Sequence, residues 1–226
     1  MPLRRVAAVL GVAVAVSIAP GSTLPAQAMP PPGDETGESV PDVGAEPTPF
    51  GTEPGRVFPV RGATSYASAH HDYPATDIFA GCGTLVVAPI AGTVLEMSRV
   101  DRWDPSSDRP RYRGGKFFSI AGQDGVRYYG SHLGSLAGRI QPGATVHVGE
   151  PVGRVGRSGN AAYTSCHLHF GLSPECGGQA DWWVRRGVVS PYRFLRSWER
   201  GGESSPRAAA TSWQQHHGCR PSDVLG

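Results

Sequence analysis

The stretch Cys166-His167-Leu168-His169-Phe170-Gly171 places two histidines one residue apart in an apolar run. This alternation predicts a β-strand, in which every second side chain lies on the same face and each residue advances the chain by about 3.3 Å. Both imidazoles are therefore expected to reach one site. Histidine is the commonest metal ligand in proteins, and a core strand has little use for two polar rings on one face. We interpret the stretch as one side of a metal site.

Short apolar runs recur between Gly and Pro residues along the middle of the chain. The expected strands cover residues 84–88, 92–97, 117–121, 126–129, 144–148, 151–155 and 167–172. Strands at this spacing predict a mainly β fold with antiparallel sheets folded over each other. One short helix is expected over 190–195, with Ser190 as its N-cap and Pro191 as its first residue. The polar, Pro-containing segment 99–115 is expected to form a long functional loop.

The chain divides into four segments. Residues 1–28 have the charged start, the apolar run of residues 6–19 and the Ala26-Gln27-Ala28 cleavage site of a signal peptide. Because the apolar run is short for a membrane span, we expect no stable membrane insertion after cleavage, and a retained anchor is the alternative. Residues 29–55 are rich in Pro, Gly and acids and predict a disordered linker. Residues 56–199 are expected to form the domain, and 200–226 a flexible tail unless Cys219 anchors it.

The charges are unevenly distributed. Residues 29–55 hold six acidic side chains and no Lys or Arg, whereas 56–226 hold nineteen basic and thirteen acidic side chains, a formal charge of +6. A basic exported domain suits an anionic partner such as a bacterial wall polymer or a membrane surface, although the same charge also serves solubility. We expect no nucleic-acid partner.

All four cysteines lie after the expected cleavage site. An even number of cysteines in an exported chain predicts two disulfides. Of the three possible connectivities we favour Cys166–Cys176 with Cys82–Cys219, because the second pair would tie the tail to the domain. Zinc-thiolate ligation is the alternative, but the cysteine spacings match no familiar structural zinc site.

Five of the eight histidines fall into three clusters. His147 lies in an ordinary alternating strand, and His216 and His217 lie in the tail, so we expect no function for these three. The clusters are His70-His71-Asp72-Tyr73-Pro74-Ala75-Thr76-Asp77, Tyr128-Tyr129-Gly130-Ser131-His132-Leu133 and the opening stretch. A catalytic zinc typically uses three protein ligands and leaves one position to water, which such a set could supply.

The order of these clusters resembles that of the lysostaphin-type zinc endopeptidases of bacterial cell walls. The segments Cys82-Gly83-Thr84-Leu85-Val86-Val87-Ala88-Pro89 and Gly149-Glu150-Pro151-Val152-Gly153-Arg154-Val155-Gly156 fit the same pattern, and the resemblance covers about residues 57–195. It implies a small antiparallel β-sheet core with loops walling a narrow groove.

Carried over to this chain, the resemblance implies zinc bound by His71, Asp77 and His169, with His132 and His167 as catalytic histidines that are not ligands. The family usually has three residues between its first His and Asp, whereas five separate His71 from Asp77, so His70 stays open as the ligand. Cys166 stands where the family often has Pro. A family tyrosine near the site corresponds to Tyr66 or Tyr73.

These observations predict a secreted zinc metalloendopeptidase that hydrolyses peptide bonds in peptidoglycan stem peptides or cross-bridges. We expect an extracellular, cell-wall-associated monomer whose partner is a peptidoglycan peptide. The main alternative is a non-catalytic relative of the same fold that binds the wall or activates a partner hydrolase. A structural β-domain with incidental histidines and a peptidase acting on free protein are further alternatives. The sequence leaves the cleaved bond open.

Overall fold

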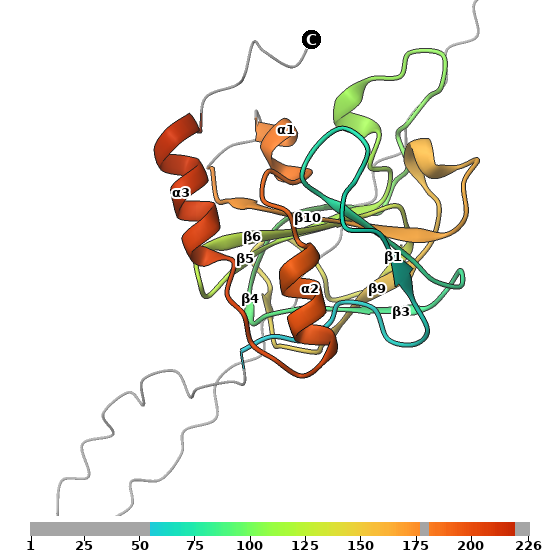
Figure 1. The fold of residues 1–226 in the computed structure, drawn as a ribbon. Helices are drawn as coiled ribbons and strands as arrows, with labels where there is room; N and C mark the ends of the chain where they lie inside the picture. Colours follow the sequence, from blue (N-terminus) through green and yellow to red (C-terminus); the bar gives the residue numbers. More distant parts are fainter. Residues whose placement is uncertain (1–54, 177–180, 220–226) are drawn as a thin grey trace, which may run out of the picture. The chain divides into compact units, whose positions relative to one another are not determined.

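The computed structural model describes residues 55–176 and 181–219. The expected signal peptide and all but the last residue of the expected linker lie outside the described residues. Two antiparallel sheets face each other, and three short helices flank them (Figure 1). The mainly β fold predicted from the sequence is confirmed. Among the described residues, no helix is long and apolar enough to span a bilayer.

The larger sheet has seven strands in the order β1-β2-β10-β6-β5-β4-β8. Its strands are β1 (Ser65–Tyr66), β2 (Thr76–Phe79), β10 (His167–Pro174), β6 (Val126–Ser131), β5 (Phe117–Gly122), β4 (Gly92–Ser98) and β8 (Thr145–Val146). The smaller sheet orders β3 (Leu85–Val87), β9 (Pro151–Val155) and β7 (Leu133–Leu136). Six of the seven expected strands are present near their predicted bounds, while the strand expected over 144–148 is reduced to two residues.

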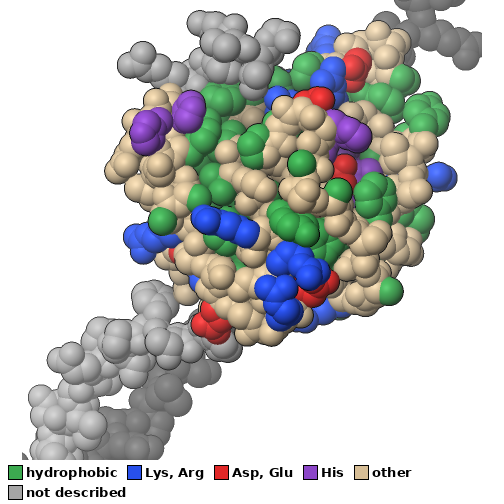
Figure 2. Space-filling view, in the orientation of Figure 1, with side chains coloured by type: hydrophobic (Ala, Val, Ile, Leu, Met, Phe, Trp, Pro, Cys, Tyr) green, Lys and Arg blue, Asp and Glu red, His purple; other side chains and the backbone are tan. Residues whose placement is uncertain are grey.

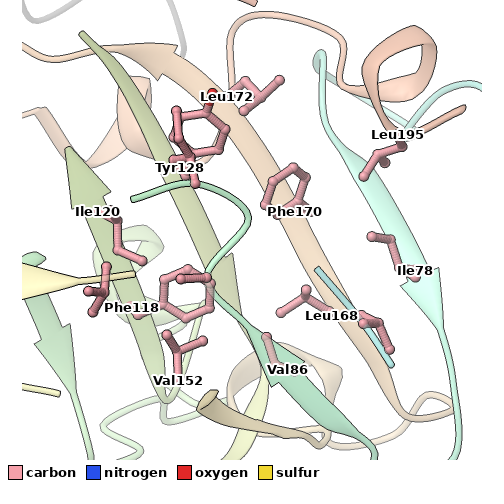
Figure 3. Close-up of a cluster of buried hydrophobic side chains, with 14 of the residues drawn as sticks. Ile78, Val86, Phe118, Ile120, Tyr128, Val152, Leu168, Phe170, Leu172 and Leu195 are labelled. Atoms are coloured by element: carbon pink, nitrogen blue, oxygen red, sulfur yellow. The ribbon is translucent and has the colours of Figure 1, made fainter. Parts of the chain in front are cut away.

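The core lies between the two sheets. The even-numbered residues Leu168, Phe170 and Leu172 of β10 have no exposed surface and pack with apolar side chains of both sheets. Figure 3 shows Leu168 near Val86 of the smaller sheet, with Phe118 and Val152 beside them. The odd-numbered residues of β10 must then point to the opposite face. Strand alternation therefore separates an apolar face from a polar one on the same strand.

The helices are α1 (Trp182–Arg185), α2 (Tyr192–Glu199) and α3 (Arg207–His217). The helix expected over 190–195 is present as α2, but it begins later and its N-cap is Pro191, not Ser190. Phe194, Leu195 and Trp198 join the core on its inner face. The indole of Trp198 lies 6.2 Å from the ring of Tyr128, measured between ring centroids.

The tail was expected to be flexible unless Cys219 anchors it, and the structure has both a disulfide at Cys219 and the helix α3. This helix starts with a run of three alanines, which favour helix. Ala210 is buried, and Trp213 lies 6.1 Å from Trp183 of α1, measured between ring centroids. The helix ends at Gly218, whose φ of 66° lies in the left-handed region that glycine adopts without strain. The part of the tail that the structure describes thus packs on the domain.

The disulfides also differ from the expected pairs, because the structure joins Cys82 to Cys166 and Cys176 to Cys219. Cys166 precedes β10 and Cys176 follows it. Ten residues of extended chain span about 33 Å, whereas the Cα atoms of a disulfide lie about 5.5 Å apart. The expected Cys166–Cys176 bridge is therefore incompatible with the strand between them.

Replacing Cys176 and Cys219 together by Ser should lower the free energy of unfolding by about 2–4 kcal/mol, because the bridge closes a long loop and holds α3. Urea denaturation of both proteins measures the difference. Peptide mapping without reduction provides the control, and recovery of a Cys166–Cys176 peptide would contradict the structure.

Candidate metal centre and groove

Strand pairing brings the candidate site residues together on the polar face of the larger sheet. His169 of β10 lies opposite Asp77 of β2 on one side and opposite Ser131 of β6 on the other. His167 lies on the same face, two residues before His169. No strand was expected at 76–79, and Asp77 was expected at one end of a Pro-containing turn, with a histidine at the other. The structure instead places Asp77 within a strand that pairs directly with the strand of the two histidines.

His169 is held between two oxygen acceptors. Its Nε2 lies 2.9 Å from the backbone carbonyl oxygen of Arg186, and its Nδ1 lies 2.8 Å from Oδ1 of Asp77. A carbonyl oxygen can only accept, so Nε2 carries the proton that is donated to Arg186. In a neutral ring, Nδ1 then presents a lone pair to the carboxylate. A proton or a metal cation between Nδ1 and Asp77 would relieve this repulsion, and a backbone carbonyl behind the ring is typical of metal-binding histidines.

The third member of this cluster is His70. Suitable ligand atoms of His70, Asp77 and His169 all lie within 4.8 Å of one another. Nε2 of His70 lies 3.6 Å from Oδ2 of Asp77, and its ring centroid lies 5.1 Å from that of His169. His71 is exposed and lies outside the cluster. The structure thus places His70, and not the expected His71, beside Asp77 and His169, because neighbouring residues of an extended segment point to opposite sides.

Burial and mutual charge set the protonation of this cluster. Burial lowers the pKa of His70, and the neighbouring His169 lowers it further. Burial acts to raise the pKa of Asp77, but the hydrogen bond with His169 and the surrounding histidine rings bring it down to about 2. Near neutral pH the cluster therefore offers a carboxylate and a neutral His70 ring, which are forms that bind a metal.

The other two predicted histidines stand beside the cluster with a similar orientation. Nδ1 of His132 lies 2.8 Å from the carbonyl oxygen of Ser158, and Nδ1 of His167 lies 2.8 Å from that of Ser165. Each ring thus donates from Nδ1 and keeps an unprotonated Nε2 when neutral. The two ring centroids lie 4.9 Å apart, and Nε2 of His167 lies 4.0 Å from Oδ2 of Asp77.

His132 occupies a special backbone position. It stands between β6 of the larger sheet and β7 of the smaller one, with a φ of 64° in the left-handed region. A residue other than glycine is uncommon there, and such positions often mark functional sites. Burial lowers the pKa of His132 to about 3, aided by the nearby rings of His169 and His167. The corner between the sheets thus holds a neutral imidazole against the cluster.

A cavity of about 130 Å³ opens onto these side chains. Its lining includes His70 and His132, parts of the loop 99–115, Asn160 and residues of the α1 segment. The loops that supply its walls lie at the upper right in Figure 1, coloured teal, green and gold. Figure 2 shows histidine side chains next to an acidic one on this face. The loop expected over 99–115 thus contributes to the wall of this cavity.

Of the two tyrosines that the sequence left open, Tyr73 is the one that lies beside the histidines of the cluster. Its hydroxyl lies 3.5 Å from Nε2 of His169, and its ring centroid lies 4.5 Å from that of His70. Burial raises the pKa of Tyr73, so its hydroxyl keeps its proton. Tyr66 bonds to Glu199 instead. The sequence did not indicate Arg186. Its backbone carbonyl oxygen orients His169, and this contact depends on the path of the chain after α1.

A potential His–Asp–His metal cluster with two further histidines in one groove defines a domain of the metallohydrolase class. Comparison with known families gives the assignment: residues 71–180 match the model of Peptidase family M23. The matched part of the chain, residues 71–180, belongs to this family.

Part of the chain is similar to a known bacterial endopeptidase. It is 31% identical to the L-Ala–D-Glu endopeptidase of Bacillus subtilis (strain 168) over 157 residues, which is 63% of this chain and 43% of that protein. The chain thus spans less than half the length of that relative.

Two solved structures are similar to this chain, and the first of them shows the same fold. A putative glycyl-glycine endopeptidase lytM from Ruminococcus gnavus is 23% identical with a TM-score of 0.50, covering 65% of this chain and 61% of that one. The catalytic domain of lysostaphin from Staphylococcus simulans is 24% identical with a TM-score of 0.44, covering 60% and 91%.

His70→Ala should abolish stoichiometric binding of a divalent metal, because it removes one of three clustered ligand atoms. We expect a loss of more than about 100-fold in affinity, since even partners outside the ligand shell are worth about 10- to 100-fold. His71→Ala is the matched control and should bind normally. Titration calorimetry with Zn²⁺ and Co²⁺ decides between them, and a loss confined to His71→Ala would reverse the assignment.

His132 should make the metal-free protein sensitive to mild acid. Its folded pKa lies near 3, below the unfolded value of about 6.5, so the unfolded chain binds more protons between these values. Stability attributable to this group is present above pH 6.5 and is lost as the pH falls toward 3. His132→Asn should flatten this dependence, because Asn tolerates the left-handed backbone. The free energy of unfolding of both proteins is measured with denaturant and a chelator between pH 7 and 4. The same dependence on pH in wild type and variant would argue against a depressed pKa of His132.

Proposed function

We propose that this protein is a secreted zinc metalloendopeptidase that hydrolyses peptide bonds in peptidoglycan. One observation carries the proposal: His169 is oriented by the Arg186 carbonyl toward Asp77, and His132 and His167 stand free at Nε2 beside them. The family supports peptidase chemistry, and the Bacillus subtilis relative is described as an L-Ala–D-Glu endopeptidase.

The donor set fits zinc. Two nitrogens and a carboxylate oxygen are ligands that zinc accepts, and three protein ligands leave one position for water. The separations of 2.8 Å and 3.6 Å from Asp77 to the two histidines lie on either side of the roughly 3.3 Å expected between two ligands of a tetrahedral zinc. His70, Asp77 and His169 would hold the ion. When bound, zinc lowers the pKa of a coordinated water and polarises the scissile carbonyl.

The remaining residues manage protons and charge. The lone pair on Nε2 of His167 or His132 accepts a proton, after which the same N–H can donate to the leaving amine. The Ser158 and Ser165 carbonyls keep both rings in the tautomer that this role needs. The hydroxyl of Tyr73 keeps its proton and lies beside Nε2 of His169. It is a hydrogen-bond donor that suits a developing oxyanion.

The arrangement favours catalysis over the non-catalytic alternative. A non-catalytic relative that binds the wall could have lost a metal ligand, and the unusual number of residues between the first histidine and Asp77 would be its main support. The intervening segment folds so that His70 still reaches Asp77, and no ligand type is missing. Two disulfides support an extracellular setting.

The test compares purified protein before and after zinc removal on isolated sacculi. Chelation should abolish the release of peptides with new amino termini, and added Zn²⁺ should restore it. His167→Ala should lower kcat by about 10²- to 10⁴-fold while keeping one zinc per chain, because a proton-transfer residue is lost and no ligand. Mass spectrometry of the released fragments identifies the bond.

His147→Ala is the control, because His147 is an exposed histidine outside the site. It should retain wild-type activity. Zinc-free protein that binds sacculi without releasing peptides, in wild type and variants alike, would favour the wall-binding alternative. Activity on casein but not on sacculi would favour a peptidase of free proteins.

A further inference from the structure

Two arginines in the wall of the catalytic cavity have no acidic partner. The cavity is lined by Arg111, Arg113, Arg185 and Arg186. Arg113 pairs with Asp108 at 2.6 Å, and Arg185 pairs with Glu96 at 2.5 Å. Within the described parts of the chain, Arg111 and Arg186 have no carboxylate within 4 Å.

The guanidinium of Arg186 is nevertheless held in place. Its central carbon lies 4.0 Å from the ring centroid of Tyr73 and 6.0 Å from that of Trp182. Stacking on an aromatic face orients a guanidinium and leaves its N–H donors at the edge free. No residue that the structure describes accepts a hydrogen bond from this side chain. Arg186 therefore presents unused donors in a fixed position.

The backbone of Arg186 is tied to the metal centre. Its carbonyl oxygen accepts the hydrogen bond from His169 at 2.9 Å. The same carbonyl packs against β10 at Gly171, where an added Cβ would lie only 2.2 Å from it. The oxygen that orients a ligand and the guanidinium that lines the cavity thus belong to one residue, so their relative position is restricted.

A half-buried, unpaired arginine is costly unless an anion joins it. The planar fork of a guanidinium matches a carboxylate through two parallel hydrogen bonds. Arg111 adds a second positive charge from the loop 99–115, and it also lines an adjoining cavity of about 590 Å³. The single acidic residue in the lining of the catalytic cavity is Asp72. The unpaired positive charges in the lining of the catalytic cavity are thus those of Arg111 and Arg186, against the one carboxylate of Asp72.

We propose that Arg186, with Arg111, binds a substrate carboxylate next to the scissile bond. The preferred substrate is then an anionic peptide with free carboxylates, as in a stem peptide, and not a neutral glycine-rich bridge. Arg186 is a specificity-determining residue in this view. The inference rests on the proposed peptidase function and narrows its substrate.

The experiment uses two stem peptides that differ only in whether the side carboxylates are free or converted to amides. Wild type should cleave the free-acid peptide with a higher kcat/KM. Arg186→Gln should lower kcat/KM for this peptide by about 10- to 100-fold, mainly through KM, as expected for loss of a charged hydrogen bond. The ratio of kcat/KM for the free-acid peptide to kcat/KM for the amidated peptide should therefore fall toward one, while the zinc content and the urea unfolding curve stay at wild-type values and show that the variant is folded with its metal centre intact.

Arg61→Gln is the matched control, because this substitution changes the net charge by the same amount. Arg61 lies away from the cavity, where its backbone pairs with β3 of the smaller sheet. It should leave both peptides unaffected. An equal loss on both peptides in Arg186→Gln would assign Arg186 a structural role and overturn the inference. Equal cleavage of both peptides by wild type, or cleavage of a pentaglycine bridge alone, would also overturn it. Failure of wild type on every wall substrate would instead reject the peptidase function itself.

Discussion

Strand β10 has to satisfy two opposite environments at once, and the rest of the structure depends on how it does so. Leu168, Phe170 and Leu172 are fully buried in the core, while His167 and His169 face the polar groove. A shift in register by one residue would turn every one of these side chains to the wrong face. Pairing on both sides, with β2 and β6, fixes the register. The apolar face of this strand thus stabilises the fold in the one alignment that assembles the polar site.

His132 and His167 each have Nδ1 bonded to a backbone carbonyl and Nε2 left for chemistry, whereas His169 has an acceptor at both nitrogens. The backbone carbonyls of Ser158, Ser165 and Arg186 supply three of these bonds. Carbonyl acceptors fix a tautomer without adding a titrating group, so the charge balance of the site is left to Asp77. One carboxylate faced by three imidazoles is an arrangement that a cation completes.

The sequence predicted most of the strands, because alternation is a local pattern, and it named four of the five side chains that the structure brings together. Alternation predicted β10 and placed His167 and His169 on one face. It could not choose between His70 and His71, since the choice depends on the path of an irregular loop. It missed β2, whose four residues are too few for a clear pattern, and α3, because Gly and Ser around the helix suggested a loose tail. The predicted strand after Cys166 already excludes a bridge from Cys166 to Cys176, but it leaves two of the three connectivities open.

The long segment between His70 and Asp77 is physically connected to the position of Arg186. The residues between His70 and Asp77 include Tyr73 and Pro74, and this loop lies against the segment that follows α1. The ring of Tyr73 carries the guanidinium of Arg186, and Gly187 approaches so closely that a Cβ there would lie 2.7 Å from the Pro74 carbonyl oxygen. Gly187 has a φ of 125°, which a larger residue would adopt only with strain. A shorter loop would remove the surface on which Arg186 stacks. The loop between His70 and Asp77 therefore both brings His70 to Asp77 and supports the guanidinium of Arg186 beside it.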